Sequence, residues 1–229
     1  MKRINYTLIF STVCIVLSLQ ALHAESTKLI RHFTFDEGFA ESVYGNEATR
    51  IIGNPTLTSG ISGQGVELDG NSALAYDDYF DLHLEQFTLT AWVKPKIKNH
   101  AGNIAGKGSD IYWIFYNHGE IKSGFYDHKF HECYSGLYLE PDQWYFLAIT
   151  YDGKTLRGYI NHHLDSIKQV QSKPRKFEGP FIIGAEGVDP SRYFFNGTTD
   201  EVRLYDGPLS TSDLLKLYKK HSTNAIENE

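Results

Sequence analysis

Aromatic and polar side chains are interleaved through one stretch of the chain, residues 112–138. A sugar ring presents apolar C–H faces that stack on aromatic rings, and its hydroxyl groups hydrogen-bond to acids, amides and imidazoles. This mixture of side chains is therefore what a glycan-binding groove needs. We predict that six residues of the stretch bind the ligand: Trp113, Tyr116, Tyr126, His128, His131 and Tyr134.

The alternative for this stretch is that half of its rings belong to the hydrophobic core. Residues 111–116 are apolar on both faces of an expected strand, so the rings would pack together out of a ligand's reach. A transition-metal site is a second alternative, because His128 and His131 stand three residues apart beside Glu132. Such a site needs a third and a fourth ligand, for which the sequence offers no candidate.

Residues for glycan-cleaving chemistry are sparse. A retaining glycosidase places two carboxylates about 5 Å apart, and the sequence contains no E-x-D-x-E run that would supply them from one strand. Glu67 and Asp69 come nearest to it. A β-eliminative lyase needs a Tyr/His acid–base pair and a cation that neutralises the uronate. Four residues are candidates for those roles: Tyr126, His128, His131 and Arg157.

Period-two hydrophobic patterns predict the strands that position these residues. In residues 87–93, Phe87, Leu89, Ala91 and Val93 share one face, which is typical of a strand with a core side. The Asp-Gly pair at 152–153 separates two further strands and predicts a hairpin. A second hairpin turn is expected at residues 117–120. The other expected strands are residues 111–116, 121–126, 144–151, 155–160, 181–184 and 199–205.

One helix is predicted, close to the C-terminus. Ser210 is the expected N-cap, and Asp213 stands three residues later, as in a capping box. Residues 214–218 then supply an apolar stripe. Because strands and helices do not alternate, the chain is predicted to be all-β: a two-sheet antiparallel sandwich of the jellyroll kind with one short C-terminal helix.

The first 24 residues are predicted to be a secretory signal peptide. Lys2 and Arg3 precede an apolar run, residues 8–19, which ends near Ala24. We expect cleavage there, a single domain over residues 25–229, a secreted (extracellular or periplasmic) location and no membrane contact after cleavage. An uncleaved anchor is the alternative. After cleavage, Cys133 would be the one cysteine of the mature chain, which rules out an intrachain disulfide.

The charge of the chain bears on its partners. The chain has 22 Lys and Arg residues and 28 Asp and Glu residues, for a net charge of −6. A nucleic-acid-binding protein usually has a basic excess, so we expect no nucleic-acid partner.

Eight short motifs occur in order along the chain. They are residues 33–38 (FTFDEG), 44–46 (YGN), 60–70 (GISGQGVELDG), 87–95 (FTLTAWVKP), 104–108 (IAGKG), 143–153 (QWYFLAITYDG), 195–205 (FNGTTDEVRLY) and 209–210 (LS). The series resembles a laminin-G-like jellyroll domain of the concanavalin A-like lectin/glucanase group, over about residues 29–220. The resemblance implies two antiparallel sheets but no particular function, because lectins, glycosidases, lyases and adhesive modules share this fold. Residues 122–136 depart from the plain hairpin of the family, and we expect an insertion there.

The resemblance also implies a structural calcium ion that joins the first strand to the last. Ca²⁺ takes about six to eight oxygen ligands from carboxylates, amides and backbone carbonyls. The predicted ligands are Asp36, Asn46 and Asp200. The alternative is that these acids cap turns or pair with Arg31 and Arg203.

These patterns together predict a secreted, non-catalytic, lectin-like module that binds a glycan or polysaccharide and is stabilised by calcium. A polysaccharide lyase or glycoside hydrolase on the same fold is the first alternative. An adhesive module that binds a protein is the second.

Overall fold

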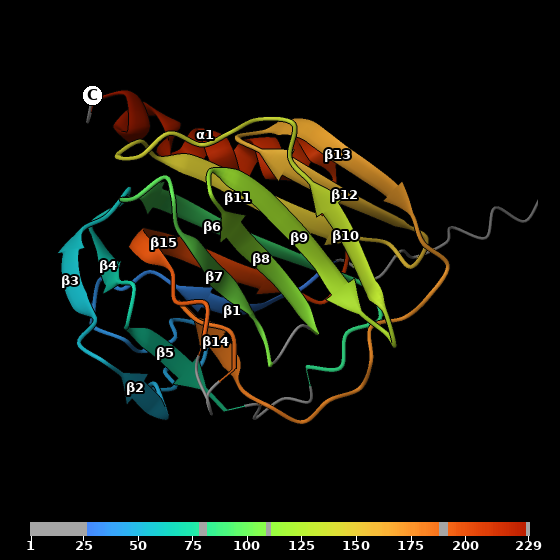
Figure 1. Ribbon diagram of the computed structural model, residues 1–229, viewed down its shortest axis with the longest axis horizontal. Coiled ribbons are helices and arrows are strands. Elements are labelled where there is room, and N and C mark those ends of the chain that lie inside the picture. Colours follow the sequence, from blue (N-terminus) through green and yellow to red (C-terminus); the bar gives the residue numbers. More distant parts are fainter. Residues whose placement is uncertain (1–26, 78–81, 109–110, 188–191, 228–229) are drawn as a thin grey trace, which may run out of the picture.

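The fold is that of a computed structural model, which describes residues 27–77, 82–108, 111–187 and 192–227. The predicted signal peptide, residues 1–24, lies outside these ranges. Within them the chain forms two antiparallel sheets that face each other and one C-terminal helix, as the sequence predicted (Figure 1).

The larger sheet, sheet A, has the strand order β13-β12-β11-β6-β15-β4-β3, and β1 pairs with β15 beside β4. Its strands are β1 (Leu29–Phe33), β3 (Thr56–Ser59), β4 (Gln64–Asp69), β6 (Phe87–Pro95), β11 (Tyr145–Tyr151), β12 (Thr155–Ile160), β13 (His163–Gln169) and β15 (Asn196–Tyr205).

The second sheet, sheet B, has the order β10-β9-β8-β7-β14-β5-β2. It lies in front of sheet A in Figure 1. Its strands are β2 (Arg50–Ile52), β5 (Ala73–Tyr76), β7 (Ala101–Lys107), β8 (Tyr112–Asn117), β9 (Glu120–Tyr126), β10 (Phe130–Tyr134) and β14 (Phe181–Ile183).

The main core fills the space between the two sheets and is rich in aromatic rings. The predicted inner face of β6 is confirmed, because Phe87, Leu89, Ala91 and Val93 are all buried in this core. The ring of Phe87 stacks on that of Tyr112 from sheet B, with 5.0 Å between the ring centroids. Such contacts between the sheets hold the two layers together.

The helix α1 (Thr211–Glu227) covers the outer face of sheet A. Ser210 is confirmed as the N-cap, since its Oγ accepts a hydrogen bond from Asp213 N; the Asp213 carboxylate in turn accepts one from Ser210 Oγ. A second hydrophobic cluster joins the helix to β6, β11 and β12, and Tyr218 stacks on Trp92 at 5.6 Å. Figure 1 shows α1, in red, beside these strands. In the described ranges, no helix is long and apolar enough to cross a membrane.

Two predicted hairpin turns are confirmed. His118 and Gly119 join β8 to β9 with φ angles of 53° and 96°, the two positive values that a tight type I′ turn requires. At the other turn, Asp152 Oδ1 accepts hydrogen bonds from Lys154 N and Thr155 N, which fixes the hairpin between β11 and β12.

Residues 122–136, which we expected to depart from the plain hairpin of the family, form a regular hairpin in this structure. This stretch continues β9 and then forms β10, and the two strands pair without a register shift from Phe130 opposite Tyr126 to Tyr134 opposite Lys122. The turn between them is held by Asp127, whose Oδ1 accepts hydrogen bonds from two backbone N–H groups. The many His and Tyr residues of this stretch belong to β9, β10 and the turn between them, and β10 alternates in burial like an ordinary strand.

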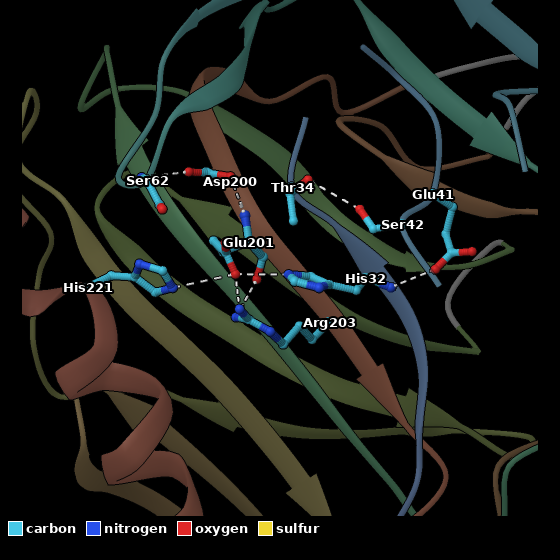
Figure 2. A network of polar contacts seen from close by, with 9 residues as sticks. All are labelled: His32, Thr34, Glu41, Ser42, Ser62, Asp200, Glu201, Arg203 and His221. Atoms are coloured by element: carbon cyan, nitrogen blue, oxygen red, sulfur yellow. Dashed lines mark hydrogen bonds and ion pairs between the residues drawn. The ribbon is translucent and has the colours of Figure 1, made fainter. Parts of the chain in front are cut away.

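A buried cluster of charged side chains lies between sheet A and α1. A bulge in β15 places Glu201 in the left-handed region, with φ 52°, where its neighbour β4 gives way to β1. The Glu201 carboxylate contacts the Arg203 guanidinium, His32 Nε2 at 2.8 Å and His221 Nε2 at 3.6 Å (Figure 2). His221 belongs to α1, so this cluster ties the helix to both β1 and β15.

The two histidines of the cluster are neutral at physiological pH. Burial, with the nearby charge of Arg203, lowers the pKa of His32 to about 3 and that of His221 to about 4. The cluster therefore consists of one carboxylate and one guanidinium with two neutral imidazoles beside them.

We expect Glu201→Gln to lower the free energy of unfolding by about 3–5 kcal/mol, because it leaves the buried Arg203 guanidinium without a counter-charge. Chemical denaturation measures the change. Glu67→Gln is the control: Glu67 pairs with Lys96 at the surface, where such a pair contributes about 0–1 kcal/mol. Equal stability of the two variants would contradict this role for the cluster.

Candidate functional site

A groove of about 340 Å³ runs across the outer face of sheet B. Its base is β8, whose side chains alternate between the two faces of the sheet. Tyr112, Ile114 and Tyr116 point into the core, while Trp113 and Phe115 line the groove. The period of two along a strand therefore gives β8 one set of rings for the core and another for the groove.

Two pairs of aromatic rings form the sides of the groove. Phe130 of β10 meets Trp113 edge to face at 5.6 Å, and Tyr193, from the segment after β14, meets Phe115 in the same way at 5.6 Å. Phe130 and Tyr193 are about half exposed, at 51% and 48%. Each pair thus combines a ring that supports the wall with a ring that is open to a ligand.

Trp113 lies at the bottom of the groove and is only 5% exposed. Its partners on the neighbouring strands are both glycines, Gly106 on β7 and Gly124 on β9. Because neither glycine carries a side chain, the indole has room to lie against the sheet beneath Phe130. Trp113 is therefore a supporting ring of the groove.

Polar side chains stand between the aromatic pairs. Glu132 Oε2 accepts a hydrogen bond from Tyr134 Oη at 2.5 Å, and this bond raises the pKa of Tyr134 to about 12, so the phenol stays protonated. Glu186 Oε1 and Arg192 Nη2 form a salt bridge of 2.6 Å at the other side. Lys122 lies on β9, opposite Phe115. The groove therefore offers both hydrogen-bonding groups and open rings.

Two of the six residues predicted to bind a ligand, Trp113 and Tyr134, lie on the outer face beside Phe130 and Lys122. Trp113 is the ring at the bottom, and Tyr134 is 47% exposed at the edge of the sheet. A third, Tyr126, contacts Phe130 at 5.0 Å and lies beneath the guanidinium of Arg175. It adjoins the groove at the end where β9 turns into β10.

The other three predicted residues lie elsewhere. Tyr116 is fully buried in the main core, and its hydroxyl donates to the carbonyl of Lys98. His131 faces inward beside the ring of Phe125, and its Nε2 lies 2.9 Å from Asp127 Oδ2. His128 is exposed in the turn between β9 and β10. None of these three side chains lines the groove.

Several groove residues were not predicted from the sequence. Phe115 could have been found, because it stands two residues from Trp113 on the same strand. Phe130 could also have been found, because it stands four residues from Tyr134 on the same strand. Arg192 and Tyr193 had no such signal, since they come from a segment about 80 residues away that only the fold brings to β8.

Two of the three predicted calcium ligands approach the same loop, residues 60–64. Asp36, just after β1, accepts a hydrogen bond from Gln64 N at 2.8 Å, and Asp200, in the β15 bulge, accepts one from Ser62 N at 3.1 Å. The loop closes on both carboxylates so tightly that a Cβ on Gly60 or Gly63 would clash with them. Two carboxylates around one loop are a donor set that fits a hard cation.

Asp200 carries an electrostatic strain in the absence of a cation. Its side chain is fully buried, and no salt bridge reaches it in the described part of the chain. Burial, together with the negative charge of Asp36, raises the pKa of Asp200 to about 8. A bound cation or a proton would relieve this strain.

The third predicted calcium ligand, Asn46, is not joined to this pair by any contact that the described residues make. The backbone carbonyl of Asn46 accepts a hydrogen bond from Glu41 N at 2.8 Å, and the side-chain Nδ2 of Asn46 is buried. Among the described residues, no three acidic, histidine or cysteine side chains form a group of metal ligands. Any further oxygen ligands at the Asp36–Asp200 pair would therefore be backbone carbonyls or water.

The residues considered for catalysis do not converge. Arg157 pairs with Asp152 on sheet A, at 2.7 Å, while Tyr126 and His131 lie on opposite faces of sheet B. Asp127 Oδ2 contacts both Ser172 Oγ and His131 Nε2. The carboxylate lies between the hydroxyl and the imidazole, so this trio lacks the hydroxyl–imidazole contact that activates a serine nucleophile.

The family is decided by a sequence match that spans most of this sandwich. Residues 68–214, from the end of β4 into α1, match the model of the concanavalin A-like lectin/glucanases superfamily. The chain belongs to this superfamily. The resemblance seen in the sequence motifs is thereby confirmed.

Solved structures of the same fold include binding domains of several proteins. Domain 4 of AbnA, an extracellular GH43 arabinanase from Geobacillus stearothermophilus, solved in complex with arabinotriose, is 21% identical, with a TM-score of 0.68 over 84% of this chain and 98% of that domain. The receptor binding domain of a botulinum neurotoxin C/D mosaic serotype is 14% identical, with a TM-score of 0.67. The binding domain of Paraclostridial Mosquitocidal Protein 1 is 17% identical, with a TM-score of 0.68.

The extent of these matches differs. The toxin matches cover 84% of this chain but only 51% and 52% of the toxin domains, so the chain spans about half of their length. A search of curated proteins finds no match. At these identities the likeness to the solved structures concerns the fold, which leaves the ligand to be argued from the site.

We expect the stability of the metal-free protein to depend on pH through Asp200. The folded protein keeps the Asp200 proton up to about pH 8, whereas the unfolded chain loses it near 3.8. The unfolded state therefore binds fewer protons in this window, and the free energy of unfolding falls as pH rises, by at most about 1.4 kcal/mol per pH unit.

The measurement compares the parent with Asp200→Asn by urea denaturation in excess chelator between about pH 5 and 8. The variant lacks the titrating group, so the parent should lose stability relative to it as pH rises. A difference between the two proteins that stays constant across this range would show that Asp200 does not titrate as described.

Proposed function

We propose that the protein is a carbohydrate-binding module whose ligand occupies the groove on sheet B. The observation that carries this proposal is the pair of half-exposed rings, Phe130 and Tyr193, on the two sides of a groove that also contains polar side chains. Aromatic faces beside hydrogen-bonding groups match the two kinds of surface that a sugar presents.

The packing of α1 supports this choice of face. The helix covers the outer face of sheet A with Leu214 and Tyr218, so the rings Trp92 and Phe146 on that face serve as a second core. The outer face of sheet B instead leaves two aromatic rings half exposed around a groove. A further support is that a domain of the same fold has been solved with arabinotriose.

We expect Phe130→Ala to weaken glycan binding by about 1–3 kcal/mol, or roughly 5- to 150-fold in Kd, because it removes one stacking ring. A glycan array identifies a ligand, and titration calorimetry then measures the loss. Leu164→Ala is the matched control, since Leu164 is also 50% exposed but lies on β13 of sheet A. Both variants should have a free energy of unfolding close to that of the parent.

Two outcomes would contradict the proposal. One is a Phe130→Ala protein that binds the glycan as tightly as the parent. The other is a parent that binds no glycan on the array but captures a protein ligand, which would favour the adhesive role.

Calcium at the Asp36–Asp200 pair and export of the mature chain are further parts of the proposal. The ion would take the place of the Asp200 proton and would join the end of β1 to β15 across the loop 60–64. Export is supported by the basic residues and the apolar run at the N-terminus. A structural ion would strengthen a secreted chain that has one mature cysteine.

We expect calcium to raise the melting temperature. Binding to the native state contributes about 2.7 kcal/mol at a hundredfold excess over Kd, which corresponds to roughly 5–11 °C for a domain of this size. Asp36→Ala should abolish the response, while Glu37→Ala, an exposed neighbour, should keep it. Identical melting of the parent in calcium and in chelator would contradict the site.

A further inference from the structure

The two half-exposed rings of the groove, Phe130 and Tyr193, come from backbone segments that are far apart on sheet B. One row of paired residues crosses the sheet from the segment after β14, through β7, β8 and β9, to β10: Phe194, Asn103, Phe115, Lys122 and Tyr134. The row takes four steps between neighbouring segments, and each step is about 4.8 Å. The segments that carry the two rings are therefore separated by roughly 19 Å.

Both rings lean toward β8, but from opposite sides and over different residues. Phe130 crosses β9 to meet Trp113, and Tyr193 crosses β7 to meet Phe115, each at 5.6 Å. Trp113 and Phe115 are themselves two residues apart, which is about 6.8 Å along a strand. A single sugar ring is only about as wide as one strand spacing. One sugar therefore cannot stack on Phe130 and Tyr193 at the same time.

The backbone of Tyr193 is held in a conformation that keeps its ring at the groove. Tyr193 lies in the left-handed region, with φ 50°, which is uncommon for a residue with a side chain. Its carbonyl accepts a hydrogen bond from Asn103 N at 2.8 Å, and just before it Glu186 and Arg192 exchange two backbone hydrogen bonds. A costly conformation that its neighbours enforce is typical of a functional position. Tyr193 is thus a second stacking surface, independent of Phe130.

Polar side chains lie between the two rings. Lys122 stands in the row that crosses the sheet, and Glu132 follows Phe130 by two residues on β10. Glu132 Oε2 accepts the hydroxyl of Tyr134, which leaves the other carboxylate oxygen available as an acceptor. One donor and one acceptor of opposite charge suit the hydroxyl groups of a sugar that lies between the two stacked ones.

We infer that the ligand is a linear chain of at least three sugars, which crosses the strands of sheet B and stacks one sugar on Phe130 and another on Tyr193. The inference rests on the proposed function, because it states the size and the direction of the glycan in the same groove. A single sugar contacts one of the two rings at a time, whereas the chain contacts both.

The experiment uses the linear polysaccharide that the glycan array identifies, hydrolysed to single sugars, disaccharides and longer oligosaccharides up to the hexasaccharide. Titration calorimetry, with NMR titration for weak binding, gives the Kd of each for the parent, Phe130→Ala and Tyr193→Ala. For the parent, the hexasaccharide should bind at least about tenfold more tightly than the single sugar. Each variant should weaken hexasaccharide binding by at least about fivefold, since each removes one stacking ring.

The single sugar provides the sharper comparison. Because it uses one ring at a time, at least one of the two variants should bind it within about twofold of the parent. Tyr193→Phe keeps the ring and should bind the hexasaccharide as the parent does. Tyr44→Ala is the matched control, since Tyr44 is 41% exposed but does not line the groove. It should leave every Kd unchanged.

Three results would overturn the inference: a hexasaccharide that binds no more tightly than the single sugar, a folded Tyr193→Ala protein that binds the hexasaccharide like the parent, or a single sugar that both variants weaken. The first is measured on the parent alone, so it does not depend on the folding of a variant. If Phe130→Ala still weakens glycan binding in these cases, the proposed function stands without the inference. If neither substitution has any effect, both are overturned.

Discussion

Along β8 the side chains alternate between the core and the outer face of sheet B. Tyr112, Ile114 and Tyr116 enter the main core, and this fixes the strand in its register between β7 and β9. Trp113 and Phe115 must then face outward, where they support the two aromatic pairs of the groove. A slip of one residue would exchange the two sets, so the packing of the core determines the geometry of the groove.

The other side of the sandwich is closed by the C-terminal helix. Tyr218 and His221 of α1 contact sheet A through an aromatic stack and through the buried Glu201 cluster. The bulge that carries Glu201 also directs its neighbour Asp200 toward the loop 60–64. One irregularity in β15 therefore serves both the attachment of the helix and the carboxylate pair at the end of β1.

The fold was largely predictable from the sequence, because the strands alternate regularly and the turns at 117–120 and 152–153 have strong local signals. The site was predictable only in part. Of the six residues predicted to bind a ligand, Trp113 and Tyr134 lie on the outer face of sheet B, whereas Tyr116 is buried in the core. Residues 111–116 are apolar throughout, so their pattern does not show which face of the strand points outward. Arg192 and Tyr193 could not be placed, since their approach to β8 depends on long-range sheet pairing that no local pattern encodes.

A crystal structure of the protein with its best-bound oligosaccharide would locate the binding site. We expect a sugar ring in van der Waals contact with Phe130 or Tyr193, on the outer face of sheet B. An oligosaccharide bound at the loop 60–64 or against α1, with the groove on sheet B empty, would contradict it.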